Sequence, residues 1–270
     1  MGAGRWRPAP ASMKSEMPEV AIATLNLFNR VGRWGERAPL VVEQVAEAAP
    51  DVIGLQEVDL LIDQGHWLAD RLNLWLGPHY YSAYHQNKSG REAAVQAIAV
   101  LTRLPVLEHE GLDYLSMDRV AQRLLLDLGE GVRLDLYNTH LHYPPNAAAE
   151  RIRRQQARRL LRWMSRHRAL PQVVVGDFNA LPEGGTIALM KRHFLSAHET
   201  AQGQEPDYTW PSPLLAEPPE APGTFDYVFV SRRGIRVMEA RVAFNRPHAD
   251  DPALYPSDHF GLLARLVVEG

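Results

Sequence analysis

The stretch QVVVGDFN, residues 172–179, decides the fold, because three consecutive valines run into a glycine and two closely spaced polar residues. Such an apolar run is typical of a strand that is buried on both faces. Gly176 lets the backbone turn or approach a neighbour closely, and Asp177 and Asn179 point the same way if the strand continues. An Asx turn that caps the following loop is the alternative interpretation of the two polar residues.

Strand and helix patterns are interleaved on both sides of this stretch, with more strands than helices. Residues 119–128 and 132–141 alternate and are joined by Gly-Glu-Gly, which is typical of a hairpin. Leu104-Pro105 ends one strand and starts another. The patterns predict helices over 36–50, 64–73 and 146–168, and further strands over 19–28, 51–58, 79–85, 95–106, 225–230, 235–244 and 261–268.

The chain shows no internal repeat and no linker that would divide it. The Pro-rich stretch 210–223 is followed by only about three predicted strands, too few for an independent domain. We therefore expect residues 1–18 to form a disordered extension and residues 19–270 to form one α/β domain, with strands sandwiched between helices.

Composition narrows the chemistry and the location. Because the chain has no cysteine, a metal site must use oxygen and imidazole ligands, which favours a hard cation. The apolar runs are shorter than the ~18 residues of a membrane span, so no integral membrane association is expected. The first 18 residues lack the apolar core of a signal peptide, which predicts a cytoplasmic location. The formal net charge of -3 indicates no polyanionic partner by itself.

Unusual polar residues fall at the ends of the predicted strands. Glu57 follows the apolar run DVIGLQ, and a buried carboxylate there is costly unless it is paired or bound to a metal. The alternative is that this strand reaches water at Gln56. Since strand ends on one side of a layered α/β protein converge on a crevice, we expect one pocket to contain Asn26, Glu57, His140, Asp177, Asn179, Asp226, Asp258 and His259.

Six short motifs carry a family resemblance: TLNL, GLQEV, NTHL, GDFN, FDYVFVS and SDHFG. In this order, spanning residues 20–268, they resemble the endonuclease/exonuclease/phosphatase superfamily, which includes DNase I-like nucleases. The resemblance implies a four-layer α/β sandwich, in which two mixed β-sheets pack face to face with helices outside. It also implies a metal-dependent phosphoric ester hydrolase, most simply a phosphodiesterase of the nuclease type.

The resemblance further implies residue roles. Mg²⁺ (or Mn²⁺) would be bound by Glu57 as primary ligand, with Asn26 assisting and Asp258 completing the site. His259 would pair with Asp226 and act on water or on the phosphate. Asp177 is the other candidate for activating water. Phosphoryl oxygens would be contacted by His140 and Asn179, and also by Arg123 if that side chain points inward along its alternating strand.

The substrate stays open at this point, beyond a phosphate ester and possibly a nucleic acid. A nuclease favours a basic loop such as residues 85–91, whereas a lipid or inositol phosphatase favours an apolar rim such as residues 208–215. A phosphomonoesterase of the same fold is a further alternative. So is a non-catalytic binding protein, and so is a zinc hydrolase built on His140 and His142, although the Asp-His that should follow such a pair is missing.

Two other groups of residues have structural interpretations. Core packing is favoured over substrate contact for Tyr80, Tyr81 and Tyr84. The arginines of the longest predicted helix fall away from its apolar stripe, so a solvated outer face is favoured over a nucleic-acid patch.

Overall fold

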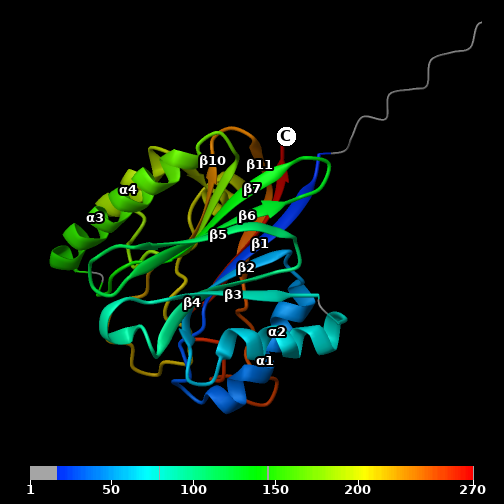
Figure 1. The fold of residues 1–270 in the computed structure, drawn as a ribbon. Coiled ribbons are helices and arrows are strands. Elements are labelled where there is room, and N and C mark those ends of the chain that lie inside the picture. The colour runs from blue at the N-terminus through cyan, green and yellow to red at the C-terminus, as the bar shows by residue number, and fades with distance from the viewer. Residues whose placement is uncertain (1–16, 79, 145, 270) are drawn as a thin grey trace, which may run out of the picture.

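The computed structural model of the protein describes residues 17–78, 80–144 and 146–269 (Figure 1). Within them, one six-stranded sheet has the order β11-β12-β1-β2-β4-β3 and a second has the order β5-β6-β7-β8-β10-β9. The first sheet contains β1 (Glu19–Asn26), β2 (Val52–Asp59), β3 (Ser82–Asn87), β4 (Gln96–Thr102), β11 (Ile235–Ala243) and β12 (Gly261–Val268). The second contains β5 (Val106–Asp113), β6 (Val120–Asp127), β7 (Arg133–His140), β8 (Gln172–Asp177), β9 (Phe194–Ser196) and β10 (Asp226–Ser231).

Helices cover the outer faces of the two sheets. In Figure 1, α1 (Trp34–Ala48) and α2 (Gln64–Leu76) lie on one side of the molecule, and α3 (Ala147–Met164) and α4 (Gly185–Lys191) lie on the other. The short helix α5 (Ala197–Gln202) follows β9 and contacts β10 and β11. No helix among the described residues is long and apolar enough to cross a membrane.

Three apolar clusters show why these layers form. Between the sheets, side chains of alternate residues interdigitate, including Val20, Val100, Leu124 and Val175. A second cluster lies under α1 and α2, and a third lies under α3 and α4. Strands buried on both faces explain the near-continuous apolar runs of the sequence. The four-layer α/β sandwich that the resemblance implies is confirmed.

Strand register gathers the polar strand ends. β8 runs parallel to β7 and antiparallel to β10, so that His140 and Asp226 both lie beside Asp177. The predicted hairpin is β6 with β7, paired antiparallel. Three neighbouring strands thus place polar side chains at one end of the second sheet.

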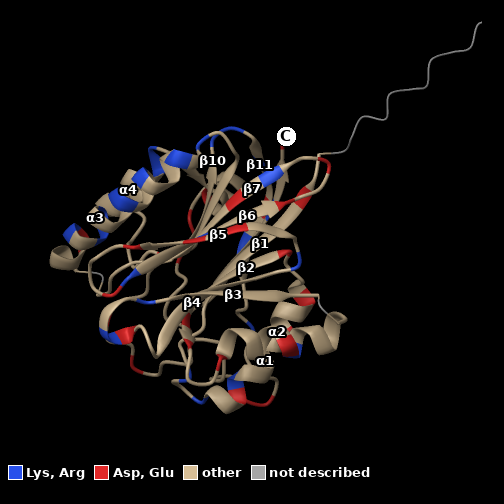
Figure 2. Ribbon diagram, viewed as in Figure 1, with Lys and Arg blue, Asp and Glu red and all other residues tan. Residues whose placement is uncertain are grey.

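Several local predictions are confirmed. Tyr81 is buried under α1 and α2, while Tyr80 and Tyr84 pack against the apolar clusters. The basic residues of α3 lie along the helix (Figure 2). The five arginines of the predicted solvated face are exposed, namely Arg151, Arg154, Arg158, Arg162 and Arg166.

Other elements differ from the predictions or fall outside the described part. The strand predicted over 79–85 begins only at Ser82, and residue 79 is outside the described residues. Helices α4 and α5 and strand β9 were not predicted. The extension predicted for residues 1–18 lies outside the described residues up to position 16. The carbonyl of Pro18 accepts a hydrogen bond from Val268 N at 3.0 Å, so contacts with the sheet begin one residue before β1.

Candidate active site

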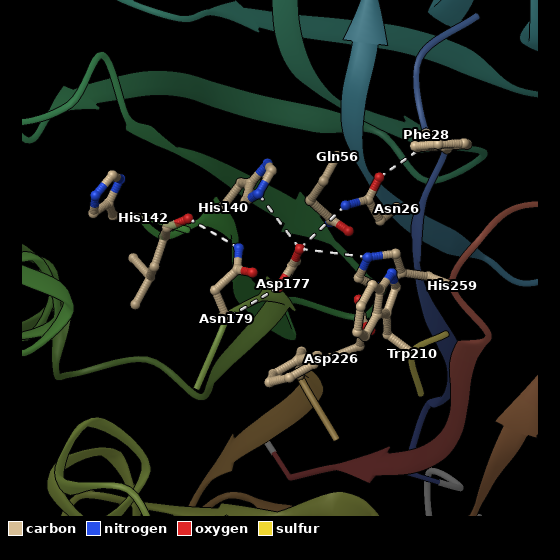
Figure 3. Close-up of polar contacts among 12 residues, drawn as sticks. Asn26, Phe28, Gln56, His140, His142, Asp177, Asn179, Trp210, Asp226 and His259 are labelled. Atoms are coloured by element: carbon tan, nitrogen blue, oxygen red, sulfur yellow. Dashed lines mark hydrogen bonds and ion pairs between the residues drawn. The ribbon is translucent and has the colours of Figure 1, made fainter. Parts of the chain in front are cut away.

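Asp177 lies at the centre of the site, at the end of β8. Figure 3 shows His140, Asn26 and His259 all directed at its carboxylate. Asn26 Nδ2 donates to Asp177 Oδ2 at 3.1 Å, and His140 Nε2 and His259 Nε2 lie 3.4 and 3.9 Å from the same oxygen. The carboxylate is nearly inaccessible to solvent. One buried acid is therefore surrounded by side chains from β1, β7 and the loop before β12.

The glycine before Asp177 makes this placement possible. Gly176 has φ 145°, and a Cβ there would lie 2.0 Å from the carbonyl oxygen of Thr139. Only glycine allows β8 to approach β7 so closely. Asn179, two residues beyond Asp177, has φ 49°, and its Nδ2 donates to Leu141 O at 3.2 Å. Asn179 N donates to Asp177 Oδ1 at 2.8 Å, so the Asx-type turn of the alternative interpretation is present. The side chains of both residues nevertheless line the same pocket.

His259 and Asp226 form the predicted pair. His259 Nδ1 and Asp226 Oδ2 are 2.8 Å apart, and both residues are buried. Burial alone would lower the pKa of His259, but the carboxylates of Asp226, Asp258 and Asp177 outweigh it and raise the pKa to about 10. The imidazole is thus an imidazolium at neutral pH.

Burial has opposite consequences for the two groups beside this cation. It raises the pKa of Asp177 to about 7, against the lowering effect of His259. It holds the pKa of His140 well below the usual value, so that imidazole is neutral. A neutral histidine, a cationic histidine and a carboxyl group that titrates near neutrality therefore share one small volume.

Glu57 reaches the pocket because β2 is irregular at this point. The register between β2 and β4 shifts between Leu55 and Val58, and Glu57 takes φ 52°. Such a bulge re-aims one side chain, and backbone in this region costs about 1–3 kcal/mol that the surrounding fold must offset. Within the described part of the chain no hydrogen bond or ion pair holds the Glu57 carboxylate, which lines the pocket.

Asp258 is held by the Pro-rich stretch 210–223. Trp210 Nε1 donates to its Oδ2 at 3.2 Å, and Ser212 N donates to its carbonyl at 2.6 Å. Burial and, to a smaller extent, the Glu57 carboxylate raise the pKa of Asp258 to about 6, against the lowering effect of His259. The stretch is therefore a wall of the site and not a linker.

These side chains enclose a cavity of about 330 Å³. Its polar floor consists of the strand-end residues, and its other wall is apolar. The lining comprises Phe28, Glu57, His140, Tyr143, Asp177, Asn179, Trp210, Leu215, Pro219, Glu220, Phe225, Asp258 and His259.

Two sets of donors could hold a divalent cation. The ligand atoms of Asp177, Asp226 and His259 all lie within 4.8 Å of one another. However, His259 is cationic and its nitrogen has no lone pair to offer while it carries its proton. The oxygens of Glu57 and Asp258, which line the same cavity, fit a hard cation better, because Glu57 has no hydrogen-bond partner among the described residues and Mg²⁺ prefers oxygen. The predicted third ligand, Asn26, does not line this cavity, and its Nδ2 donates to Asp177.

Arg123 does not lie in this pocket, so its predicted inward orientation is wrong. Leu124 faces the space between the sheets, whereas Arg123 lies on the opposite face of β6 beside Tyr137. Its guanidinium is buried and ion-paired, at 2.6 Å, with both Asp135 and Glu110. The alternation of the strand identified two faces but not which one meets the site.

Two cations near His140 were not predicted as site residues. The register of β6 with β7 pairs Ala121 with Thr139, so Arg119, two residues earlier, lies beside the residues that follow β7. One Arg119 nitrogen, Nη1, is buried without a hydrogen-bond partner in the described structure. Buried Lys88, from the flagged basic loop 85–91, adds to the charge, since both cations lower the pKa of His140. The position of Arg119 just before the hairpin strand was the available signal.

Arg37 of α1 is a third residue that was missed, and it organises the loops of the site. It is fully buried. Its Nη1 donates at 2.8 Å both to Leu27 O, just after β1, and to Pro256 O, just before Ser-Asp-His. The helical pattern of residues 36–50 contains no signal for this role, because the partners lie in other segments.

Comparison with known proteins yields a family match. Residues 23–259 match the sequence model described as "Endonuclease/Exonuclease/phosphatase family". Human Nocturnin is 26% identical over 255 residues, covering 86% of this chain and 58% of Nocturnin. The Arabidopsis thaliana protein "Carbon catabolite repressor protein 4 homolog 3" is 26% identical over 165 residues, covering 56% and 34% of the two chains. The chain thus spans little more than half of the length of Nocturnin and about a third of the plant protein.

Solved structures share the fold. The human Nocturnin catalytic domain with bound sulfate superposes with a TM-score of 0.74 at 22% identity, covering 93% of this chain and 94% of that one. TDP2 from D. rerio, complexed with a single-strand DNA product, superposes with a TM-score of 0.76 at 19% identity, covering 92% and 98%. At these identities the likeness concerns the fold.

Proposed function

Because the chain belongs to the endonuclease/exonuclease/phosphatase family, we propose that it is a divalent-metal-dependent phosphoric ester hydrolase that cleaves phosphodiesters in the pocket around Asp177. The observation that carries the proposal is the joining of two groups in one cavity. The first is Asp177 with His259, whose ring is held by Asp226 from outside the cavity lining. The second is the Glu57 carboxylate, which lies near Asp258 and itself has no hydrogen bond or ion pair among the described residues. Burying these charged groups together is costly unless they serve chemistry.

Asp177 is the proposed general base. Its pKa near neutrality places it where a proton acceptor is most effective at physiological pH. It takes a proton from the water that attacks phosphorus, as the bond between phosphorus and the leaving oxygen breaks. Asn26 fixes its orientation by a hydrogen bond of 3.1 Å. A positioned base of this kind contributes about 10²–10⁴ in rate.

His259 is the proposed electrostatic partner of the phosphate. As an imidazolium it cannot accept a proton from water at neutral pH, but it can donate a hydrogen bond to a phosphoryl oxygen or to the leaving group. Asp226 holds its ring through the 2.8 Å contact at Nδ1, which leaves Nε2 directed toward Asp177 and the pocket. The sequence left open whether His259 or Asp177 is the base, and the opposite pKa shifts of the two groups support our proposal of Asp177.

The metal site is proposed at Glu57, Asp258 and Asn26. A divalent ion bound there, Mg²⁺ or Mn²⁺, would supply positive charge to the phosphate oxygens. Asn179 and neutral His140 are the proposed donors to phosphoryl oxygens, and the positive charges of Arg119 and Lys88 act on His140. The substrate phosphate would therefore lie between the proposed metal site and these donors.

The apolar wall offers contacts to an organic group next to the phosphate, and this supports a diester over a small monoester as the proposed substrate. The rings of Phe28, Trp210 and Phe225 line the cavity, and such faces stack well on nucleobases. The DNA product named for D. rerio TDP2 is consistent with a nucleic-acid substrate for this fold. A phosphomonoesterase or a lipid or inositol-phosphate hydrolase of the same fold is the alternative.

Hydrolysis of model esters tests this proposal. Bis(p-nitrophenyl) phosphate and p-nitrophenyl phosphate are assayed with Mg²⁺, with Mn²⁺ and with EDTA, for wild type, Asp177→Asn and His259→Ala. We expect metal-dependent cleavage of the diester, lost by about 10²-fold or more in both variants. His142→Ala is the matched control, because His142 is only two residues from His140 but does not line the pocket.

Other outcomes separate the alternatives. Preference for the monoester would replace the diesterase by a phosphomonoesterase. If the folded protein shows no cleavage of either ester, of DNA, of RNA or of phosphoinositides with any metal, the hydrolase proposal fails and a binding role replaces it.

A further inference from the structure

A second cluster of metal-ligating side chains lies outside the catalytic pocket, where α2 begins. Asp63 precedes the helix, His66 lies in its first turn, and His85 comes from the edge strand β3. One ligand atom from each of the three lies within 4.8 Å of the others. None of the three lines the catalytic cavity.

The contacts within the cluster are close. His66 Nδ1 and Asp63 Oδ1 are 2.8 Å apart, and the ring centroids of His66 and His85 are separated by 4.5 Å. The side chains of His66 and Asp63 are more than half exposed, so both are free to change rotamer. Ligands of a tetrahedral Zn²⁺ lie about 3.3 Å from each other when each is 2.0–2.1 Å from the ion. Closure onto an ion therefore needs only small movements of two exposed side chains.

His85 supplies the fixed ligand. Its position on β3 is set by pairing with Ala99 of β4. Its Nε2 is buried and has no hydrogen-bond partner among the described residues. Buried polar atoms are almost always satisfied, so an orphaned imidazole nitrogen at the centre of a cluster of ligands indicates a missing partner.

The first turn of α2 is shaped around this nitrogen. A Cβ at Gly65 would lie 2.1 Å from His85 Nε2. Glycine is otherwise unfavourable inside a helix, and its presence here leaves the space that the imidazole occupies. Gly65 therefore lowers the helix propensity of the first turn but leaves room for the His85 ring.

We propose that Asp63, His66 and His85 bind a transition-metal ion of the Zn²⁺ class, at a site separate from the catalytic pocket. Two imidazoles and one carboxylate suit such an ion better than Mg²⁺, and three protein ligands leave a position for water. The ion would link the start of α2 to the edge strand β3. This site does not depend on the proposed hydrolytic activity.

Side-chain NMR tests the site directly. Long-range ¹H–¹⁵N spectra of the histidine imidazoles are recorded while Zn²⁺ is added, with excess Mg²⁺ present to occupy the oxygen-lined pocket. The signals of His66 and His85 are assigned from His66→Ala and His85→Ala. We expect both signals to change with one equivalent of Zn²⁺, and the affinity to fall about tenfold or more in Asp63→Ala. His193→Ala, which removes an exposed histidine elsewhere, is the matched control and keeps the wild-type affinity.

Gly65→Ala provides an independent variant, because it removes no ligand. Alanine suits a helix, so the fold is retained, but its Cβ displaces the His85 ring. We expect the Zn²⁺ affinity to fall as it does in Asp63→Ala. The proposal is overturned if excess Zn²⁺ leaves the His66 and His85 signals of the folded protein unchanged, or if Asp63→Ala and Gly65→Ala both bind with wild-type affinity.

Discussion

Replacing Arg37 with methionine removes the guanidinium that ties the end of β1 to the loop carrying Asp258 and His259. The side chain is fully buried and donates to six carbonyl oxygens, those of Leu27, Phe28, Asn29, Val31, Gly32 and Pro256. Methionine keeps much of the packing volume but donates nothing.

The expected loss of stability depends on how many of these hydrogen bonds are buried. Only the bonds to Leu27 O and Pro256 O, both 2.8 Å, are fully buried; the other carbonyls are partly buried and can turn to water. Leaving a buried carbonyl unsatisfied costs about 1–3 kcal/mol, so two cost about 4 kcal/mol. For a domain of this size, that corresponds to a fall in Tm of roughly 8–16 °C.

Urea and thermal unfolding measure this loss. Arg33→Met is the control, because Arg33 is four residues away and its side chain is 45% exposed. Its ion pairs with Glu36 and Asp251 are solvent-screened, so it should change stability far less. The reasoning is refuted if Arg37→Met unfolds with the same midpoint as Arg33→Met.

Three further predictions concern the site. Asp226→Asn should lower the pKa of His259, because burial then outweighs the remaining carboxylates. It should also reduce kcat by about 10²-fold or more. A pH–rate profile with the wild-type pKa and the wild-type rate would contradict this prediction. In the metal-free protein, His259 binds its proton more tightly in the folded state than in the unfolded state. Its contribution to stability is therefore complete below pH 6.5 and is lost as the pH rises to about 10. The urea midpoint of the wild type should fall across this pH range, and that of Asp226→Asn should fall less steeply. Arg119→Ala should lower kcat/KM about tenfold or more and leave the stability of the fold unchanged. Arg123→Met should cost about 3–5 kcal/mol of stability and leave the kcat of the folded fraction unchanged. The reverse pattern would show that Arg123, and not Arg119, acts in the site.

The central residues of the site were predictable because each one lies at or close to an end of a strand. The apolar run before Asp177 predicted a buried strand, and a polar residue at the end of such a strand indicated a functional role. The register then places His140 and Asp226 beside it. The motifs of the sequence identified these residues, but the distances between their side chains follow from the strand pairing, which the sequence does not show.

The features that were not predicted depend mainly on contacts between segments that are distant in the sequence. Glu57 was identified, but the bulge that aims it breaks the alternation on which strand prediction relies. Arg123 was predicted to contact phosphate and Arg119 was missed, since alternation does not tell which face of β6 meets the pocket. Helix α4, with seven residues, is too short to show a helical period. Arg37 was missed because its partners are backbone carbonyls, which leave no trace in side-chain patterns.

The Mg²⁺ dependence of phosphodiester hydrolysis in Glu57→Gln tests whether this carboxylate binds the catalytic metal. Glu220→Gln is the matched control, because both carboxylates line the cavity but Glu220 is engaged at its rim by the Tyr143 hydroxyl. The account predicts that EDTA abolishes and Mg²⁺ restores activity in wild type and Glu220→Gln. It predicts that Glu57→Gln loses about 10-fold to 100-fold in apparent Mg²⁺ affinity or activity. A Glu57→Gln protein with wild-type activity and wild-type Mg²⁺ dependence would contradict it.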